Sequence, residues 1–328
     1  METAAIDRPF AGNRVVRDCG ARYPIFQSPM GWLGRSRLAA AVSNAGGLGI
    51  LETSSGEFDA VKREILAMPG LTDAPYAVNL PLHFLKHDDS IVDWVIERGI
   101  RFVTTSAGDP AKYAERLKRA GITVYHAVPS LEGARKAAAA GVDGLVVEGG
   151  ESGAFRSPKE IGVFTLLQAV RAATDLPIVA AGGVVDGRGM AAAFALGAEG
   201  VQMGTRFVAS AENPASAAYK AAIVAAGEHD TTVTNRGVGP CVRALKGVAT
   251  EAIAAGRLTV PEALQETKSP YFDGDMSRGL APAGESSALI DEVLPCDVIV
   301  RRTIESFWRE IDRLAALVTP RAAVAEVA

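Results

Sequence analysis

Short apolar stretches alternate along the first two-thirds of the chain with stretches whose apolar residues recur at helical spacing. At each joint a helix-like stretch ends in glycine and a β-type stretch follows. Gly46, Gly99, Gly121, Gly141 and Gly197 stand at these joints. Because glycine adopts the positive φ at which many helices end, each joint predicts the end of a helix and the start of a strand.

This rhythm predicts eight strands, at residues 24–27, 49–51, 76–79, 102–104, 123–126, 144–148, 178–181 and 201–203. Several are continuous apolar runs, which is typical of parallel strands buried on both faces. Regular alternation of strand and helix favours an α/β fold of the closed (β/α)₈ TIM-barrel type, with an open doubly wound sheet as the alternative. The sequence lacks the G-x-G-x-x-G fingerprint that would favour the open sheet.

The pattern changes near residue 214. Residues 215–227, 242–255 and 260–266 are predicted to be helices, 269–282 a loop, and 298–317 a final amphipathic helix. We therefore predict a barrel domain from residues 1–213 and 297–328, and a mostly helical extension from 214–296 packed over one end of it.

Composition narrows the function. The chain is 48% hydrophobic with a formal net charge of −4, so it can build a large core and shows no basic footprint for nucleic acid. It has neither a signal-peptide pattern at residues 1–12 nor an apolar run of about 20 residues, so we expect a cytoplasmic protein without a membrane partner. Cys19, Cys241 and Cys296 are too scattered to predict a metal site or a disulfide framework.

Chemistry in a barrel is expected at the carboxyl ends of the strands, often with a phosphate held after strands seven and eight. Gly182 and Gly183 follow the seventh predicted strand, and Gly204 and Thr205 follow the eighth. Glycines let an anion approach backbone N–H groups closely. These turns therefore predict phosphate binding, with ordinary tight turns as the alternative.

Other strand ends carry polar or small residues. Asn79 ends the third strand, where its amide either reaches a ligand or is satisfied by the backbone. His126 is the only one of four histidines at a predicted strand end, as a site residue or a hydrogen-bonded structural one. Gly149, Gly150 and Gly153 would let a flat ring lie close to the backbone, although a flexible loop has the same composition.

Three segments together resemble the nitronate monooxygenases (2-nitropropane dioxygenases) and the flavin-dependent enoyl-acyl-carrier-protein reductases. Residues 24–31 read Pro-Ile-Phe-Gln-Ser-Pro-Met-Gly and residues 44–49 read Asn-Ala-Gly-Gly-Leu-Gly, which is similar to the opening of this family. Residues 177–210 resemble its FMN-phosphate region and 279–290 its C-terminal flavin-side motif. The resemblance implies a barrel with FMN at the strand ends and the phosphate on Gly182, Gly183, Gly204 and Thr205.

The resemblance also implies which residues lie along the flavin ring: Pro29, Met30, Gly31, Asn79, Gly153 and Glu148, the last where many relatives carry Gln. Relatives usually read Glu-x-Gly-Gly-His-x-Gly after the sixth strand, with the His as catalytic base or acid. Here residues 151–157 read Glu-Ser-Gly-Ala-Phe-Arg-Ser, so Phe155 stands in the position of that His. A phenyl ring cannot accept a proton.

The departure favours an NADH- or NADPH-dependent reductase of an activated unsaturated substrate, with a CoA thioester as one candidate because a similar His-less branch resembles acyl-CoA-directed reductases. Backbone donors near Gly153 and the Ser152 side chain would stabilise a developing enolate, and Phe155 would shape the substrate pocket. His126 is the first candidate proton donor, followed by Tyr271 and solvent. Nitronate monooxygenase activity and flavin binding without turnover are the alternatives, and a homodimer is one option for assembly.

Overall fold

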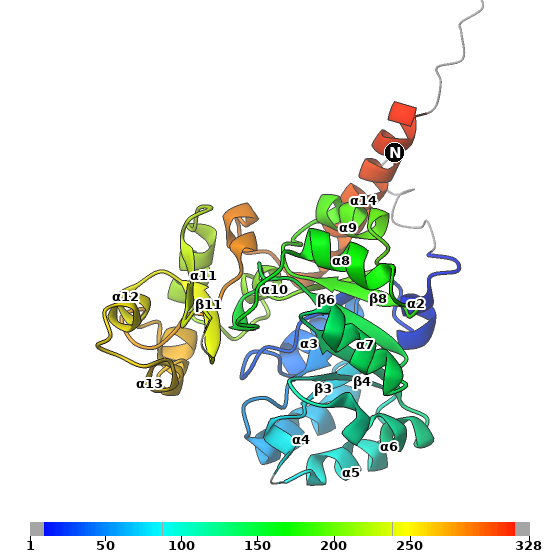
Figure 1. Ribbon diagram of the computed structural model, residues 1–328, viewed down its shortest axis with the longest axis horizontal. Helices are drawn as coiled ribbons and strands as arrows, with labels where there is room; N and C mark the ends of the chain where they lie inside the picture. The colour runs from blue at the N-terminus through cyan, green and yellow to red at the C-terminus, as the bar shows by residue number, and fades with distance from the viewer. Residues whose placement is uncertain (1–9, 87, 238, 319–328) are drawn as a thin grey trace, which may run out of the picture.

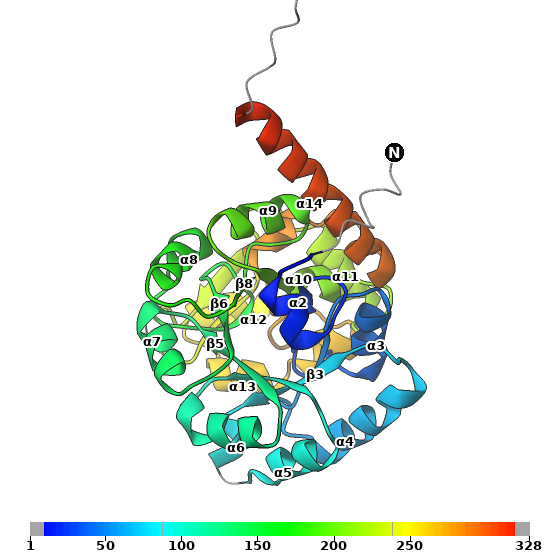
Figure 2. The ribbon, with the colours of Figure 1, turned by 90° about the vertical axis from the view of Figure 1, so that its right-hand side faces the viewer.

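The computed structural model describes residues 10–86, 88–237 and 239–318. Eight parallel strands follow one another around a barrel in the order β1-β9-β8-β6-β5-β4-β3-β2. Between β2 and β1 the ring closes through an isolated bridge from Phe26 to Leu48. The side-chain amide of Gln27 completes this closure. Its Oε1 accepts from the Ile50 N–H at 3.1 Å, and its Nε2 donates to the Ile50 carbonyl at 3.2 Å. The predicted (β/α)₈ barrel is confirmed (Figure 2).

The eight barrel strands match the predicted ranges closely. They are β1 Ile25–Gln27, β2 Gly49–Leu51, β3 Tyr76–Pro81, β4 Phe102–Ser106, β5 Thr123–Val128, β6 Gly144–Glu148, β8 Ile178–Ala181 and β9 Gly200–Met203. The helices outside them are α3 Ser36–Asn44, α4 Phe58–Ala67, α5 Ser90–Glu97, α6 Ala114–Arg119, α7 Leu131–Ala139, α8 Val163–Arg171 and α9 Gly187–Ala195, with the short α10 Thr205–Val208 after β9. Short helical turns η1 Met68–Gly70, η2 Phe84–Lys86 and η3 Pro110–Lys112 complete this region.

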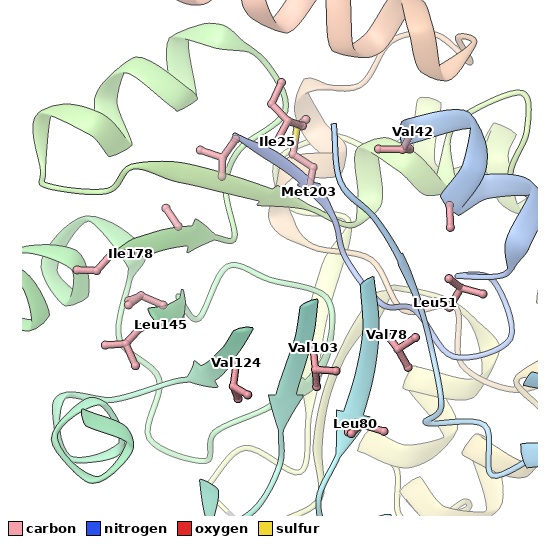
Figure 3. Close-up of a cluster of buried hydrophobic side chains, with 14 of the residues drawn as sticks. Ile25, Val42, Leu51, Val78, Leu80, Val103, Val124, Leu145, Ile178 and Met203 are labelled. Carbon is pink, nitrogen blue, oxygen red and sulfur yellow. The ribbon is translucent and has the colours of Figure 1, made fainter. Parts of the chain in front are cut away.

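Side chains alternate between the two sides of each strand. One set, which includes Val78, Val103, Val124 and Leu145, points outward and packs under the helices (Figure 3). The other set fills the barrel interior with Phe26, Leu48, Ile50, Ala77, Phe102, Tyr125, Val146, Val179 and Ala181. Both faces of the strands are therefore buried, which explains why the strands are continuous apolar runs.

Helix α2 (Arg14–Cys19) lies across the amino-terminal end of the barrel (Figure 2). Inside the barrel, the Tyr125 hydroxyl donates to the Asp18 carboxylate on this helix at 2.9 Å. A Cβ on Gly144 would lie 2.3 Å from the Tyr125 ring, so only glycine fits beside it. Arg14 anchors the helix further by donating from Nε to the Glu199 carboxylate at 2.9–3.0 Å. This end of the barrel is closed.

The chain after residue 213 forms α11 Ala217–Val224, β10 Thr231–Thr234, β11 Cys241–Leu245, α12 Val248–Ala254, α13 Val260–Gln265, a π-helical turn at Ser269–Asp273 and a 3₁₀ turn at Glu285–Leu289. The prediction of one helix over 242–255 was wrong for its first residues, which form β11. Val242 and Ala244 pack in an apolar cluster with α12 and α13, while Arg243 projects from the other face of the strand. This two-residue alternation stabilises a strand rather than a helix.

The segment after β6 contains a strand that the sequence pattern did not predict. Residues Ala154–Arg156 form β7, which pairs antiparallel with β11 in a three-stranded sheet of order β10-β11-β7. This sheet therefore combines a strand from the barrel region with two strands from the extension. Figure 1 shows the extension over the carboxyl end of the barrel.

The last helix, α14 (Cys296–Val318), packs against α9. A Cβ on Gly187 would lie 2.0 Å from the Phe307 nitrogen, so glycine permits the close approach of these helices. The end of α14 projects beyond the barrel (Figure 1). None of the helices in the described part of the chain combines the length and apolar character that crossing a membrane requires.

Candidate active site

The barrel interior changes from apolar to polar toward the carboxyl end of the strands. Ser28, Asn79, Thr104 and Glu148 each stand two residues beyond a member of the interior apolar cluster, so alternation directs them inward. Gln202 also faces inward, because its neighbours Val201 and Met203 belong to the outward-facing core. We call these five residues the lumen rim. A polar rim above a packed apolar interior is the usual place for a barrel active site.

Within the rim, hydrogen bonds hold the amide side chains. The Asn79 side-chain nitrogen donates to the Thr104 hydroxyl at 3.0 Å and to its carbonyl at 3.2 Å. The Gln202 side-chain nitrogen donates to the Ser28 hydroxyl at 3.4 Å. Both predictions for the Asn79 amide, that it reaches a ligand or is satisfied within the protein, are compatible with this geometry. Its nitrogen is satisfied inside the protein, and only its oxygen would serve a ligand.

Beside the rim, the predicted phosphate turns lie next to each other because β8 and β9 are paired. Gly182 and Gly183 have φ of +97° and +74°, a region that L side chains rarely adopt. The nearest atom to a Cβ built on Gly183 is Val163 Cγ1 at 3.9 Å, so the turn leaves open space there. A Cβ on Gly204 would meet only Ser28 and Met30, at 3.5 Å or more. Glycine backbone thus borders a cradle that side chains would fill.

The Ser152 hydroxyl lies beside this cradle. Its hydroxyl oxygen is buried and has no hydrogen-bond partner among the described residues. The same oxygen lies 2.5 Å from the position that a Cβ on Gly182 would take. A buried, unpaired hydroxyl is costly unless a ligand satisfies it. The residues present therefore fit a phosphate group beside Gly182.

The C-terminal motif reaches the same place. Thr205 Oγ1 accepts from the Gly284 N–H at 3.0 Å, and the Glu285 N–H donates to the Glu151 carbonyl at 2.9 Å. A Cβ on Gly153 would lie 2.7 Å from the Ala283 backbone, so this glycine is required for contact between the two segments. The loop after β6, the turn after β9 and the motif at 279–290 thus form one wall.

Pro29, Met30 and Gly31 follow β1 and are partly exposed at the carboxyl end. The Met30 sulfur lies 4.0 Å from the Cβ position of Gly204, which places this loop next to the cradle. The Met30 carbonyl accepts from the Gly34 N–H at 2.7 Å, which fixes the loop as a tight turn. The structure therefore brings the first and last predicted cofactor segments together.

His126 lies apart from the rim. Val124 and Val128 on the same strand belong to the outward-facing core, so alternation directs His126 toward the helices, where Nδ1 is 2.8 Å from Thr105 Oγ1. Burial lowers the pKa of His126 to about 4, opposed in part by the charge of Asp109. The imidazole is therefore neutral near pH 7 and is not brought together with the other predicted site residues.

Arg156, rather than Phe155, reaches the rim from β7. Its guanidinium forms an ion pair with Glu148 at 2.8 Å and donates to the Gly149 carbonyl at 2.6 Å. Phe155 projects from the opposite face of β7 and is 55% exposed. The ring is thus not part of the core, and its role in shaping a pocket stays a prediction.

A second arginine holds the same loop. From β11, Arg243 donates to the Gly150 carbonyl at 3.2 Å and forms ion pairs with Glu160 at 3.2 Å and Glu285 at 2.9 Å. Sequence reasoning missed both arginines, because their partners lie on other segments. An arginine inside an apolar run, as in Cys-Val-Arg-Ala-Leu, is the signal that would have identified Arg243.

At the opposite end of the barrel, a hollow is lined by Thr123 at the start of β5, by residues that precede β6 and β8, and by Arg14, Arg17 and Asp18 of α2. Charged groups in its lining pair with each other: Arg14 with Asp175 at 3.4 Å and Arg17 with Asp18 at 2.9 Å. We assign it no chemistry. Among the described residues, no cluster of three or more His, Cys, Asp or Glu side chains is placed to hold a metal ion.

Comparison with known proteins identifies the family. A family model described as nitronate monooxygenase matches residues 14–305. The chain belongs to the nitronate monooxygenase family. The resemblance found in the sequence is confirmed, and the chain is an oxidoreductase of this family, whose membership supports a flavin cofactor.

Relatives within and around the nitronate monooxygenase family differ in their named activities. The chain is 36% identical to (3aS,4S,5R,7aS)-5-hydroxy-7a-methyl-1-oxo-octahydro-1H-indene-4-carboxyl-CoA dehydrogenase of Mycobacterium tuberculosis, over 91% of this chain and 97% of that protein. It is 31% identical to the nitronate monooxygenase of Pseudomonas aeruginosa, over 89% and 98% of the two chains. FabK from Thermotoga maritima superposes with a TM-score of 0.89 at 37% identity, covering 93% of this chain and 99% of FabK. Membership of the family thus identifies the fold but does not identify the substrate.

Proposed function

We propose that the protein is an FMN-dependent reductase that takes electrons from NADH or NADPH and acts on an activated unsaturated acyl thioester, such as a CoA ester. The observation that carries this choice is Phe155. Position 155 supplies no proton acceptor, so oxidation of a neutral nitroalkane cannot use a base at this position. The CoA dehydrogenase of M. tuberculosis is a relative whose name refers to a CoA ester.

FMN fits the cradle by its chemistry. Its phosphate would lie on the backbone at Gly182, Gly183 and Gly204, with the Ser152 and Thr205 hydroxyls as neighbours. Its ring would extend over the lumen rim, past Met30 and Asn79. When bound, FMN would supply hydride transfer between the nicotinamide and the substrate.

The chain's own residues orient the substrate. The backbone around Gly153 is held rigidly against Ala283 and Gly284, which favours a fixed position for its N–H groups. Such fixed donors would stabilise negative charge that develops on a thioester oxygen. The exposed ring of Phe155 would contact the apolar part of an acyl chain.

Anaerobic mixing tests the proposal. The purified protein should bind FMN, NADH or NADPH should bleach the flavin absorbance within seconds, and an enoyl-CoA such as crotonyl-CoA should restore it. A protein that binds no FMN contradicts the proposal. A flavin that is bound but reduced by neither nicotinamide also contradicts it.

A nitronate monooxygenase is the second candidate, since family relatives carry that name. An alkyl nitronate is already an anion and needs no base. Oxygen uptake with a nitronate in the absence of NADH or NADPH would support this activity instead. A homodimer stays a prediction, which light scattering of the purified protein would test.

A further inference from the structure

The carboxylate of Glu148 takes no part in the phosphate cradle and stays accessible to a substrate. It ends β6 and faces the lumen, and 31% of its side chain is exposed. Two nearby carboxylates differ. Glu52 is fully buried against Arg35, and both oxygens of Glu151 accept from the Val163 N–H. Glu148 therefore combines a position on the lumen rim with access from outside.

Arg156 fixes how this carboxylate is oriented. Its Nη2 binds Oε1 of Glu148, while Nη1 donates to Gly149 and Nε to the Phe155 carbonyl at 2.9 Å. The guanidinium is 3% exposed, so it is locked in place by burial as well as by these bonds. One oxygen of Glu148 is thus held, and among the described residues no hydrogen bond or ion pair engages Oε2, while 31% of the side chain is exposed. A carboxylate with one anchored oxygen and one accessible oxygen is well arranged for proton transfer.

Resting on the proposed function, we propose that Glu148 is the catalytic residue that moves the proton at the α-carbon of an acyl thioester. In the reducing direction, FMN when bound would supply the hydride for the Cβ–H bond, and the C=C electron pair would shift toward the thioester carbonyl. The Glu148 carboxyl then gives its proton to Cα, and water reprotonates it. In the reverse direction the Glu148 carboxylate would remove the α-proton, and bound FMN would accept the β-hydride.

The residue types at the two positions support this assignment. Phe155 on β7 has no group that exchanges protons, whereas Glu148 at the end of β6 has one. Arg156 holds the Glu148 carboxylate at the rim.

The test uses acetoacetyl-CoA, whose enolate has its own ultraviolet absorbance band. The full-length protein, with and without FMN and without nicotinamide, should bind it and show the enolate band at a pH where the free compound is mostly neutral. Glu148→Gln keeps an acceptor for Arg156 but cannot take a proton. The absorbance of the enolate band should therefore fall at least about 10-fold in this variant. Glu148→Asp keeps a carboxylate and should retain part of it.

The matched control is Glu132→Gln, which removes an exposed ion pair with Lys136 on α7, outside the active site. It should keep the band. A full band in Glu148→Gln, or no band in the wild-type protein, overturns the assignment. FMN titration of every variant separates the two proposals: loss of FMN binding in the wild type contradicts the proposed function, whereas normal FMN binding with an unchanged band contradicts only the role of Glu148.

Discussion

The two ends of the barrel are made by the same eight strands but are completed in opposite ways. At the amino end, α2 covers the opening, Tyr125 is bonded to Asp18, and Arg14 is bonded to Glu199. At the carboxyl end, glycine turns leave open space and a buried Ser152 hydroxyl lacks a partner among the described residues. Satisfied polar groups stabilise a fold, whereas unsatisfied ones indicate a place for a ligand.

The largest effect expected from this comparison is on FMN binding. Gly183 and Gly121 have nearly the same φ, +74° and +76°, and open surroundings, but they lie at opposite ends of the barrel. Gly183→Val should raise the Kd for FMN about 1,000-fold, because losing two hydrogen bonds to a charged phosphate costs about 3–6 kcal/mol. Gly121→Val should carry a similar backbone strain and leave the Kd unchanged. Fluorescence titration of FMN measures both, and equal Kd values would mean that the phosphate lies elsewhere.

The next effect concerns the missing base. Phe155→His should retain FMN and raise oxidation of neutral nitroalkanes by less than about 10-fold, below the roughly 10²–10⁴-fold of a well-placed general base, because residue 155 faces away from the lumen rim. Oxygen uptake is the measurement. Phe155→Ala is the control, and it should weaken substrate binding without slowing flavin reduction by NADH or NADPH. Rapid oxidation of neutral nitroalkanes by the unmodified protein would show that another residue serves as base.

His126 sharpens the comparison because it lies at the carboxyl end but faces the helices. Its pKa is about 4 in the folded state and near 6.5 when unfolded, so the unfolded chain binds more protons between these values. Stability should therefore fall as the pH drops from 7 to 5, by about 2 kcal/mol more in the wild type than in His126→Asn. Urea unfolding at the two pH values measures this difference. Loss of turnover in His126→Asn with FMN still bound would instead identify His126 as a proton donor.

The smallest effect is expected at the closed end. Tyr125→Phe removes the bond to Asp18 and should lower the free energy of unfolding by about 1–2 kcal/mol. FMN affinity and turnover should not change, because the hydroxyl lies on the far side of the apolar interior. Thermal unfolding and FMN titration together check this. A change in FMN affinity would mean that the two ends are coupled.

The sequence predicted the barrel well because its strands are buried on both faces and glycine marks most joints. It predicted which segments border the cradle, since Gly182, Gly183 and Gly204 directly follow their strands. It could not predict β7, whose three residues become a strand only by pairing with β11 far along the chain. For the same reason it missed Arg156 and Arg243, whose bonding partners depend on the folded arrangement. The division into a barrel domain and an extension stays a prediction.

Pairing between β7 and β11 makes the position of two adjacent side chains a matter of register. Residues 155 and 156 point to opposite faces of this small sheet, and Arg156 is matched with Cys241. A slip of one residue would exchange the faces, turning an uncharged ring toward Glu148 and a guanidinium toward solvent. An insertion or deletion far away, in the connection between β10 and β11, would therefore be felt at the rim of the barrel. The length of this connection in the extension thus helps to decide which side chain faces Glu148.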